Sequence, residues 1–228
     1  KLLEEMKIWI SKNEYNFVRE KLLTRGIPTP MLLIKDHKRK NAEGVFPTRI
    51  VVPATNFTAG FAKLGYLGIK RIFNEENINY FSATIVQASD MKEKVEKKNF
   101  KANEVTVATL DIENMYPSIS FGVVKKAVSF YARNLKEERK LVIANCLKMI
   151  KFSMSNQLLG FLNKFYEYGQ NNKPDERPLT IGGYESAWLA DLVASFILDN
   201  SQDFFIATNY HGIYRDDGIV FFNGKWNN

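Results

Sequence analysis

The order of the helix-like and strand-like stretches is the strongest constraint on the fold of this chain. Apolar residues at helical spacing predict helices at about 1–24, with a break near 13, and at 58–74, 85–99, 120–133, 137–150 and 184–198. β-Branched and apolar runs predict strands at 31–34, 49–52 and 105–112, short paired strands within 157–168, and a strand–turn–strand unit at 213–222. Because these stretches do not alternate regularly, their order favours an α+β fold over a doubly wound parallel sheet.

Composition excludes several classes of protein. Apolar residues make up 45% of the 228 residues, which is enough to bury a core and too many for a disordered chain. The single cysteine, Cys146, excludes a disulfide-built secreted module, and we expect it to be a core residue. For the protein as a whole we expect a reducing intracellular compartment, nuclear or cytoplasmic. No apolar run approaches the ~20 residues that cross a bilayer, so we expect no membrane partner. The net charge of +7 favours a polyanionic partner such as nucleic acid.

Acidic residues mark the ends of two strand-like runs. Asp111 lies near the end of an apolar strand that we expect to be buried, and Asp216 and Asp217 form the turn of the strand–turn–strand unit. Carboxylates held close together resist ionisation unless a cation neutralises them, and Mg²⁺ is bound by a few carboxylates together with substrate phosphates. Each feature also has an ordinary explanation, since Asp-Asp-Gly is a good hairpin turn and many strands end in an acid.

Several segments, taken in chain order, resemble the motifs of reverse transcriptases. The segment 111–116, DIENMY, resembles motif A, and the segment 214–217, YRDD, resembles motif C inside a hairpin with apolar flanks. Between them, Gly182 and the run 186–192, SAWLADL, resemble motif B, a glycine turn that opens a helix rich in small residues. Such motifs are weak singly and stronger together in the family's order.

Three further segments are similar to the Penelope-like branch of this family. Residues 33–38 and 47–51 are similar to its fingers segment, and residues 163–166, NKFY, stand before motif B as in that branch. The sequence departs from the pattern at Ala187, where these enzymes have a proline, at Tyr184 and Glu185, where small residues are usual, and at Arg215 in the variable position of motif C.

The resemblance implies the α+β architecture of a right-hand polymerase, in which helices back an antiparallel palm sheet. It assigns 1–29 to an N-terminal helical extension, 30–104 to the fingers, 105–119 to the palm with motif A, 120–178 to connecting helices and a hairpin, and 179–228 to the palm with motifs B and C. Since the chain starts at Lys1 and stops soon after motif C, we expect a fragment whose thumb and remaining polymerase segments are missing.

The resemblance also implies a chemistry. The 3′-hydroxyl of a DNA primer on an RNA template would attack the α-phosphate of a dNTP and release pyrophosphate. Asp111 and Asp216 would hold two Mg²⁺ ions, or Mn²⁺ in their place, with Asp217 as a nearby carboxylate and the carbonyl of Ile112 as a further ligand. Tyr116 would stack under the sugar and exclude a 2′-hydroxyl, unless it is an ordinary core tyrosine.

Basic and flexible residues would complete the site. Lys35 and Arg49 would contact the triphosphate, because guanidinium and ammonium groups both suit phosphate. Gly182 would allow close approach of nucleotide or template-primer, or simply form the turn before a helix. The nucleic-acid-binding candidates are Lys38, Arg39, Lys40 and Arg215, although part of the basic run fits a solvated loop tip equally well.

Two other functions stay open on the sequence. One is a catalytically silent reverse-transcriptase-like domain that binds RNA or a partner protein. The other is a phosphatase or nuclease with an acidic metal centre, which would account for the carboxylates but not for Tyr116, the glycine-led helix or the basic hairpin.

Overall fold

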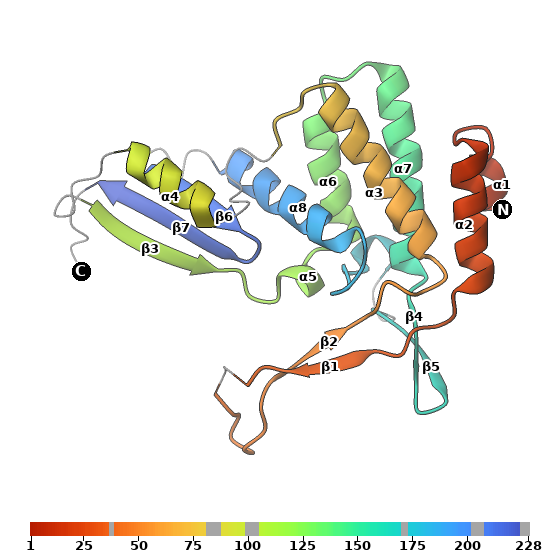
Figure 1. Ribbon diagram of the computed structural model, residues 1–228, viewed down its shortest axis with the longest axis horizontal. Coiled ribbons are helices and arrows are strands. Elements are labelled where there is room, and N and C mark those ends of the chain that lie inside the picture. The colour runs from red at the N-terminus through yellow and green to blue at the C-terminus, as the bar shows by residue number, and fades with distance from the viewer. Residues whose placement is uncertain (37–38, 81–87, 99–104, 170–172, 202–207, 224–228) are drawn as a thin grey trace.

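The computed structural model describes residues 1–36, 39–80, 88–98, 105–169, 173–201 and 208–223 (Figure 1). Its helices are α1 (Leu2–Met6), α2 (Lys12–Thr24), α3 (Ala59–Glu75), α4 (Ala88–Lys97), α5 (Met115–Ser118), α6 (Phe121–Ala132), α7 (Glu137–Ser155) and α8 (Ser186–Asn200), with a 3₁₀ turn at Pro174–Glu176. Its strands are β1 (Met31–Ile34), β2 (Thr48–Val51), β3 (Val105–Asp111), β4 (Leu158–Phe161), β5 (Lys164–Glu167), β6 (Thr208–Tyr214) and β7 (Asp217–Asn223).

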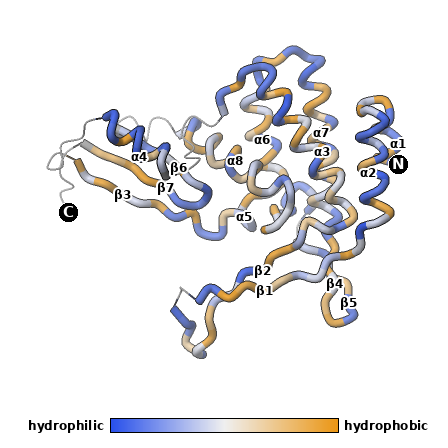
Figure 2. Tube along the Cα trace, viewed as in Figure 1, coloured by the Kyte–Doolittle hydropathy of each residue, from blue (hydrophilic) through white to orange (hydrophobic). Residues whose placement is uncertain are grey.

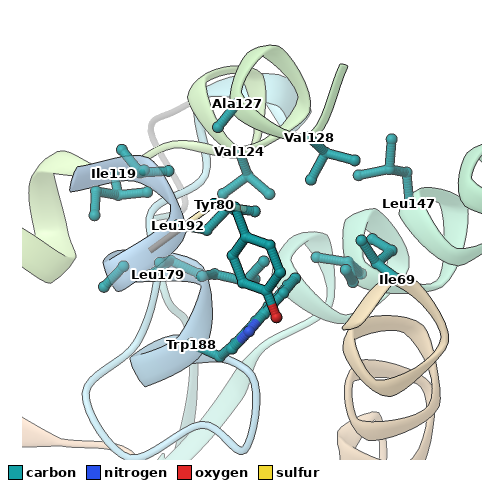
Figure 3. Close-up of a cluster of buried hydrophobic side chains, with 14 of the residues drawn as sticks. Ile69, Tyr80, Ile119, Val124, Ala127, Val128, Leu147, Leu179, Trp188 and Leu192 are labelled. Carbon is teal, nitrogen blue, oxygen red and sulfur yellow. The ribbon is translucent and has the colours of Figure 1, made fainter. Parts of the chain in front are cut away.

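A helical body made by α3, α6, α7 and α8 holds the main apolar core. Ile69, Val124, Leu147 and Leu192 come from these four helices and are buried together (Figure 3). Trp188 of α8 lies in the same cluster, with its ring centroid 5.8 Å from that of Tyr80. The core therefore fixes α8, the helix predicted from motif B, on one side of the body, and Trp188 packs there as a core side chain.

The N-terminal helices form a smaller cluster against the body. Ser11 caps α2, since its hydroxyl accepts from the amide of Glu14 while the Glu14 carboxylate accepts from the amide of Ser11. This capping box explains why the predicted helix at 1–24 is broken between α1 and α2. Val18 of α2 is fully buried against Phe61 of α3 and Met149 of α7.

Two antiparallel hairpins project from the helical body (Figure 1). The hairpin β1–β2 pairs Met31 with Val51 through Ile34 with Thr48, and β4–β5 pairs Leu158 with Glu167 through Phe161 with Lys164. The Gly160 amide of β4 donates to the carbonyl of Pro28, three residues before β1, at 3.0 Å, which ties the two hairpins together. The apolar residues of β1 are all exposed, and Figure 2 colours the strand by its hydrophobic character.

A three-stranded antiparallel sheet, in the order β3-β7-β6, carries the candidate acidic residues. The expectation that the strand before Asp111 is buried is wrong, because Val107 and Leu110 of β3 are about half exposed, at 51% and 49%. β3 is an edge strand of a three-stranded sheet, and Val107 and Leu110, which are three positions apart, lie on its opposite faces, so neither face of this strand is fully covered.

The structure confirms the mixed helix and antiparallel sheet content that the sequence predicts. Strand 31–34 and the helices near 58–74 and 120–133 lie within a residue or two of the predicted bounds, and α7 runs five residues further than predicted, to Ser155. Cys146 is buried in α7, as expected. In the described ranges, no helix combines the length and the apolar character needed to cross a membrane.

Candidate functional site

The predicted acidic residues meet at one end of the three-stranded sheet. Asp111, the last residue of β3, lies directly opposite Asp217, the first residue of β7. The Ile112 amide donates to the Asp216 carbonyl at 2.8 Å and closes this end of the ladder. Opposite residues of an antiparallel pair point to the same face, with Cβ atoms ~4.5–5.5 Å apart. The register therefore puts the Asp111 and Asp217 carboxylates side by side, and both residues are exposed.

The turn between β6 and β7 holds the third acid and carries backbone strain. Tyr214 pairs with Asp217, so Arg215 and Asp216 are the two turn residues. Arg215 has φ of +57°, a left-handed conformation that costs a non-glycine residue about 1 kcal/mol or more. Such strain persists only where neighbouring contacts hold the residue in place.

The contacts that hold Arg215 come from α8. Its guanidinium donates to the Asp191 carboxylate at 2.5 Å and to the carbonyl of Ala187 at 3.0 Å. Burial raises the pKa of the Asp191 carboxyl, and the adjacent Arg215 opposes that rise. The Arg215 side chain, proposed from the sequence to contact nucleic acid, therefore links the acidic turn to α8.

The charges of the acidic turn and of the β1–β2 hairpin both influence the phenol of Tyr116. It belongs to the short helix α5, which follows Asn114 in a left-handed conformation, φ +50°. Burial raises the pKa of the Tyr116 phenol, and the charges of Asp216 and Asp191 raise it further while Arg215 and Arg49 lower it. The predicted sugar-contacting residue is thus half-buried beside the predicted catalytic turn.

Gly182 brings the loop before α8 into contact with the end of β2 in the β1–β2 hairpin. The Val52 amide donates to the Ile181 carbonyl at 2.7 Å. Gly182 has φ of +108°, and a Cβ at this position would lie 2.4 Å from the Val52 carbonyl oxygen. Only glycine fits here, because a side chain would collide with the backbone at the end of β2. The structure thus gives this glycine a close-packing role between two segments.

The predicted phosphate-contacting residues share one face of the β1–β2 hairpin. Arg49 pairs with Leu33, and the Lys35 amide donates to the Pro47 carbonyl one step beyond the ladder. Because side chains alternate along a strand, Lys35 and Leu33 lie on one face, and Arg49 shares it. The Arg49 charge on this face lowers the pKa of the Tyr116 phenol.

The basic loop beyond the hairpin is mostly exposed. Arg39 and Lys40 lie at the surface, and the Lys40 ammonium is 4.9 Å from the centre of the Phe46 ring. Lys38, also predicted to bind nucleic acid, lies outside the described residues, as does His37.

The residues that the structure describes form no preassembled group of three or more His, Cys, Asp or Glu side chains able to hold a metal ion. The carboxylates of Asp111 and Asp217 nonetheless suit a hard cation, because Mg²⁺ usually takes one or two carboxylates and completes its shell with water and substrate phosphates. These residues therefore fit such an ion, and Asp216 lies next to them in the turn.

The sequence assigned no structural or functional role to two acids, Glu185 at the N-cap of α8 and Asp191 within this helix. Glu185, at the N-cap, is fully buried, and burial raises its carboxyl pKa to about 7. Asp191 binds Arg215, as described above. Both had a sequence signal: each acid stands in or next to a mostly apolar helix, where an unpaired charge is costly.

Similar folds occur in nucleic-acid polymerases. Apo telomerase from Candida tropicalis matches with a TM-score of 0.59 at 9% identity over 87% of this chain and 39% of the telomerase. The same telomerase truncated from its C-terminal domain gives 0.56 at 11% over 92% and 48%. A chain of the segmented genome and RNA polymerase complex inside a dsRNA virus gives 0.57 at 9% over 99% and 22%.

These similarities concern the fold. No protein-family model and no curated protein sequence matches the chain. The chain spans less than half the length of each of these polymerase structures. The fold is thus a polymerase-like one, found both in a reverse transcriptase relative and in a viral RNA polymerase complex.

Proposed function

We propose that the chain is the fingers and palm core of an RNA-directed DNA polymerase, a nucleotidyltransferase from a retroelement of the Penelope-like branch or a domesticated relative. The observation that carries this proposal is the register of β3 and β7, which pairs Asp111 with Asp217 and puts Asp216 in the adjoining turn. An accidental Asp-Asp turn would not require a third acid directly across the ladder from Asp217, 106 positions earlier in the sequence.

In this proposal the acidic end of the sheet binds the reacting groups. Two Mg²⁺ ions held by Asp111, Asp216 and Asp217, with the carbonyl of Ile112, would lower the pKa of the primer 3′-hydroxyl and neutralise charge on the triphosphate. The carboxylates contribute position as well as charge. Since their backbone is fixed by the ladder and by the Ile112–Asp216 hydrogen bond, little reorganisation is needed on binding.

The remaining residues orient the nucleotide. Lys35 and Arg49 share a hairpin face and would contact the phosphates, leaving Tyr116 for the sugar. A phenol ring under the sugar would exclude a 2′-hydroxyl and select dNTPs. The dNTP would therefore lie between the β1–β2 hairpin and the β6–β7 turn, with primer and template beyond it.

A catalytically silent domain that binds RNA or protein is the second candidate. The observation in its favour is that no group of three metal-binding side chains is preassembled in the described parts of the chain. The strained Arg215 is also engaged by Asp191 and so is not free for a substrate. A domain that has lost catalysis would keep the fold and its basic surface.

Primer extension separates the two candidates. The complete protein is given an RNA template, a DNA primer, dNTPs and Mg²⁺ or Mn²⁺, and is compared with Asp216→Asn. Asp175→Asn, which changes an exposed carboxylate of the 3₁₀ turn, is the matched control. We expect extension by the wild type and the control and a loss of at least a hundredfold in Asp216→Asn. Equal extension by all three would remove the catalytic proposal.

A further inference from the structure

The turn of the β6–β7 hairpin contains an arginine where a glycine would be less strained. Tyr214 pairs with Asp217, so Arg215 is the first of the two turn residues, and its φ is +57°. Both favoured types of two-residue hairpin turn need a positive φ at this position, which glycine adopts readily and arginine does not. Because such strain persists only where other contacts hold the residue, the Arg215 side chain must contribute a compensating interaction.

That interaction comes from one face of α8, which lies beside the turn (Figure 1). The Arg215 guanidinium donates to the Asp191 carboxylate at 2.5 Å and to the Ala187 carbonyl at 3.0 Å. Ala187 and Asp191 are four residues apart, so they share a face of the helix. The Asp191 side chain is only 15% exposed, and a carboxylate buried against a mostly apolar helix needs a partner. The two charged side chains therefore depend on each other.

An apolar contact fixes the strand that leads into the turn. Ile213, two residues before Arg215, is buried in the core cluster that also contains Leu192 of α8. This contact anchors the end of β6 but does not determine the conformation of the turn beyond it. The ion pair between Arg215 and Asp191 acts on the turn itself, and thus on the neighbouring Asp216.

The ion pair also adjoins Tyr116. The short helix α5, which carries Tyr116, lies against α8. After burial, which raises the pKa of the Tyr116 phenol, the largest influences on that pKa are the charges of Arg215, Asp191 and Asp216. The ion pair is therefore next to two residues that have separate roles in the proposed function, Asp216 for the metals and Tyr116 for the sugar.

We infer that Asp191 is a positioning residue of the proposed polymerase site, and that it acts through Arg215. Asp191 contacts neither metal nor nucleotide. It holds the β6–β7 turn against α8, so that Asp216 stays beside Asp111 and Asp217 before a metal ion binds. This inference rests on the proposed function, and it gives Arg215 a different role from the nucleic-acid contact that the sequence predicts.

Arg215→Gly separates positioning from stability. Glycine removes the strain at φ +57° together with the contact to Asp191, so we expect this variant to unfold at nearly the same urea concentration as the wild type. The turn should nonetheless loosen. The Ile112 amide, which donates to the Asp216 carbonyl at 2.8 Å, should lose hydrogen-exchange protection in Arg215→Gly and in Asp191→Ala. This readout requires neither metal nor nucleotide.

Primer extension by the complete protein measures the consequence for the site. In both variants we expect the Mg²⁺ concentration for half-maximal extension to rise about fivefold with an unchanged KM for the template-primer, and the double variant should be no worse than either single one. Arg215→Lys keeps a cation near Asp191 and should bring the Mg²⁺ requirement most of the way back. Arg139→Ala, which breaks ion pairs with Glu75 and Glu76 on the helical body, is the control and should change neither readout.

Two outcomes would overturn the inference. If Arg215→Gly keeps the Ile112 amide protected, the ion pair does not hold the turn. If Arg215→Gly raises the KM for the template-primer and Asp191→Ala does not, Arg215 contacts nucleic acid directly. A wild type that extends no primer would refute the proposed function, and exchange of the Ile112 amide would still decide whether Asp191 positions the turn.

Discussion

Gly182→Ala tests the contact between the loop before α8 and the β1–β2 hairpin. The new Cβ would lie 2.4 Å from the Val52 carbonyl oxygen, whereas ordinary contact begins near 3.4 Å, so the two segments must separate by about 1 Å. Separation on that scale breaks the 2.7 Å hydrogen bond from the Val52 amide to Ile181. Losing that bond costs ~1 kcal/mol, and an alanine at φ +108° costs ~1–3 kcal/mol more.

We therefore expect Gly182→Ala to lower the free energy of unfolding by about 2–4 kcal/mol. Urea unfolding gives the loss in stability, and hydrogen exchange of the Val52 amide reports the local bond directly. Gly26→Ala is the matched control, since a Cβ there meets nothing within 4 Å, and it should stay within ~0.5 kcal/mol of the wild type.

Gly183→Ala gives an intermediate case. The nearest atoms to its Cβ would be side-chain atoms rather than backbone, the Ser186 hydroxyl at 2.5 Å and the Glu185 carboxylate at 3.1 Å. It should cost less than Gly182→Ala. If Gly182→Ala unfolds at the same urea concentration as Gly26→Ala and keeps the Val52 amide protected, the loop does not pack on β2 as described.

Three further outcomes follow from the same region. Burial raises the pKa of Glu185 from 4.5 to about 7, so its stabilising contribution is complete below pH 4.5 and is lost as the pH rises through 7. The loss is about 3 kcal/mol, which urea unfolding of wild type and Glu185→Gln between pH 4 and 8 would measure. Arg215→Ala should cost about 1 kcal/mol, because the Arg215 side chain is 39% exposed and solvent screens its ion pair with Asp191. A double-mutant cycle with Asp191→Asn should give a coupling above ~0.3 kcal/mol. Tyr116→Ala should raise rNTP use relative to dNTP use in primer extension at least tenfold, and Tyr116→Phe should not; unchanged discrimination in both would remove the steric role.

The sequence predicted most of the local structure because local periodicity determines it. The strand at 31–34 has the predicted bounds, and the break near 13 falls beside the Ser11 capping box. The paired short strands within 157–168 are confirmed, with Leu162 and Asn163 in the left-handed conformations that tight hairpin turns need. Short apolar runs and turn residues carry this information within a few positions.

The exposure of β3 could not be read in the same way. The run 105–112 is β-branched and apolar, which is typical of a buried strand, yet β3 is the edge of its sheet. Edge or centre depends on strand order, a long-range property. The partners of Arg215 and Gly182 were hidden for the same reason, because Asp191 and Val52 lie 24 and 130 positions away in sequence.

The contacts that the sequence could not predict all converge on the start of α8. The loop that leads into this helix packs on Val52, which directly follows the β1–β2 hairpin, and the first turns of α8 hold Arg215 of the acidic turn through Asp191 and Ala187. The same helix therefore sets the position of the hairpin that carries Arg49 and of the turn that carries Asp216. A shift of α8 would change the spacing between the proposed phosphate contact and the proposed metal ligand. Gly182→Ala should thus impair nucleotide use even though it touches neither group.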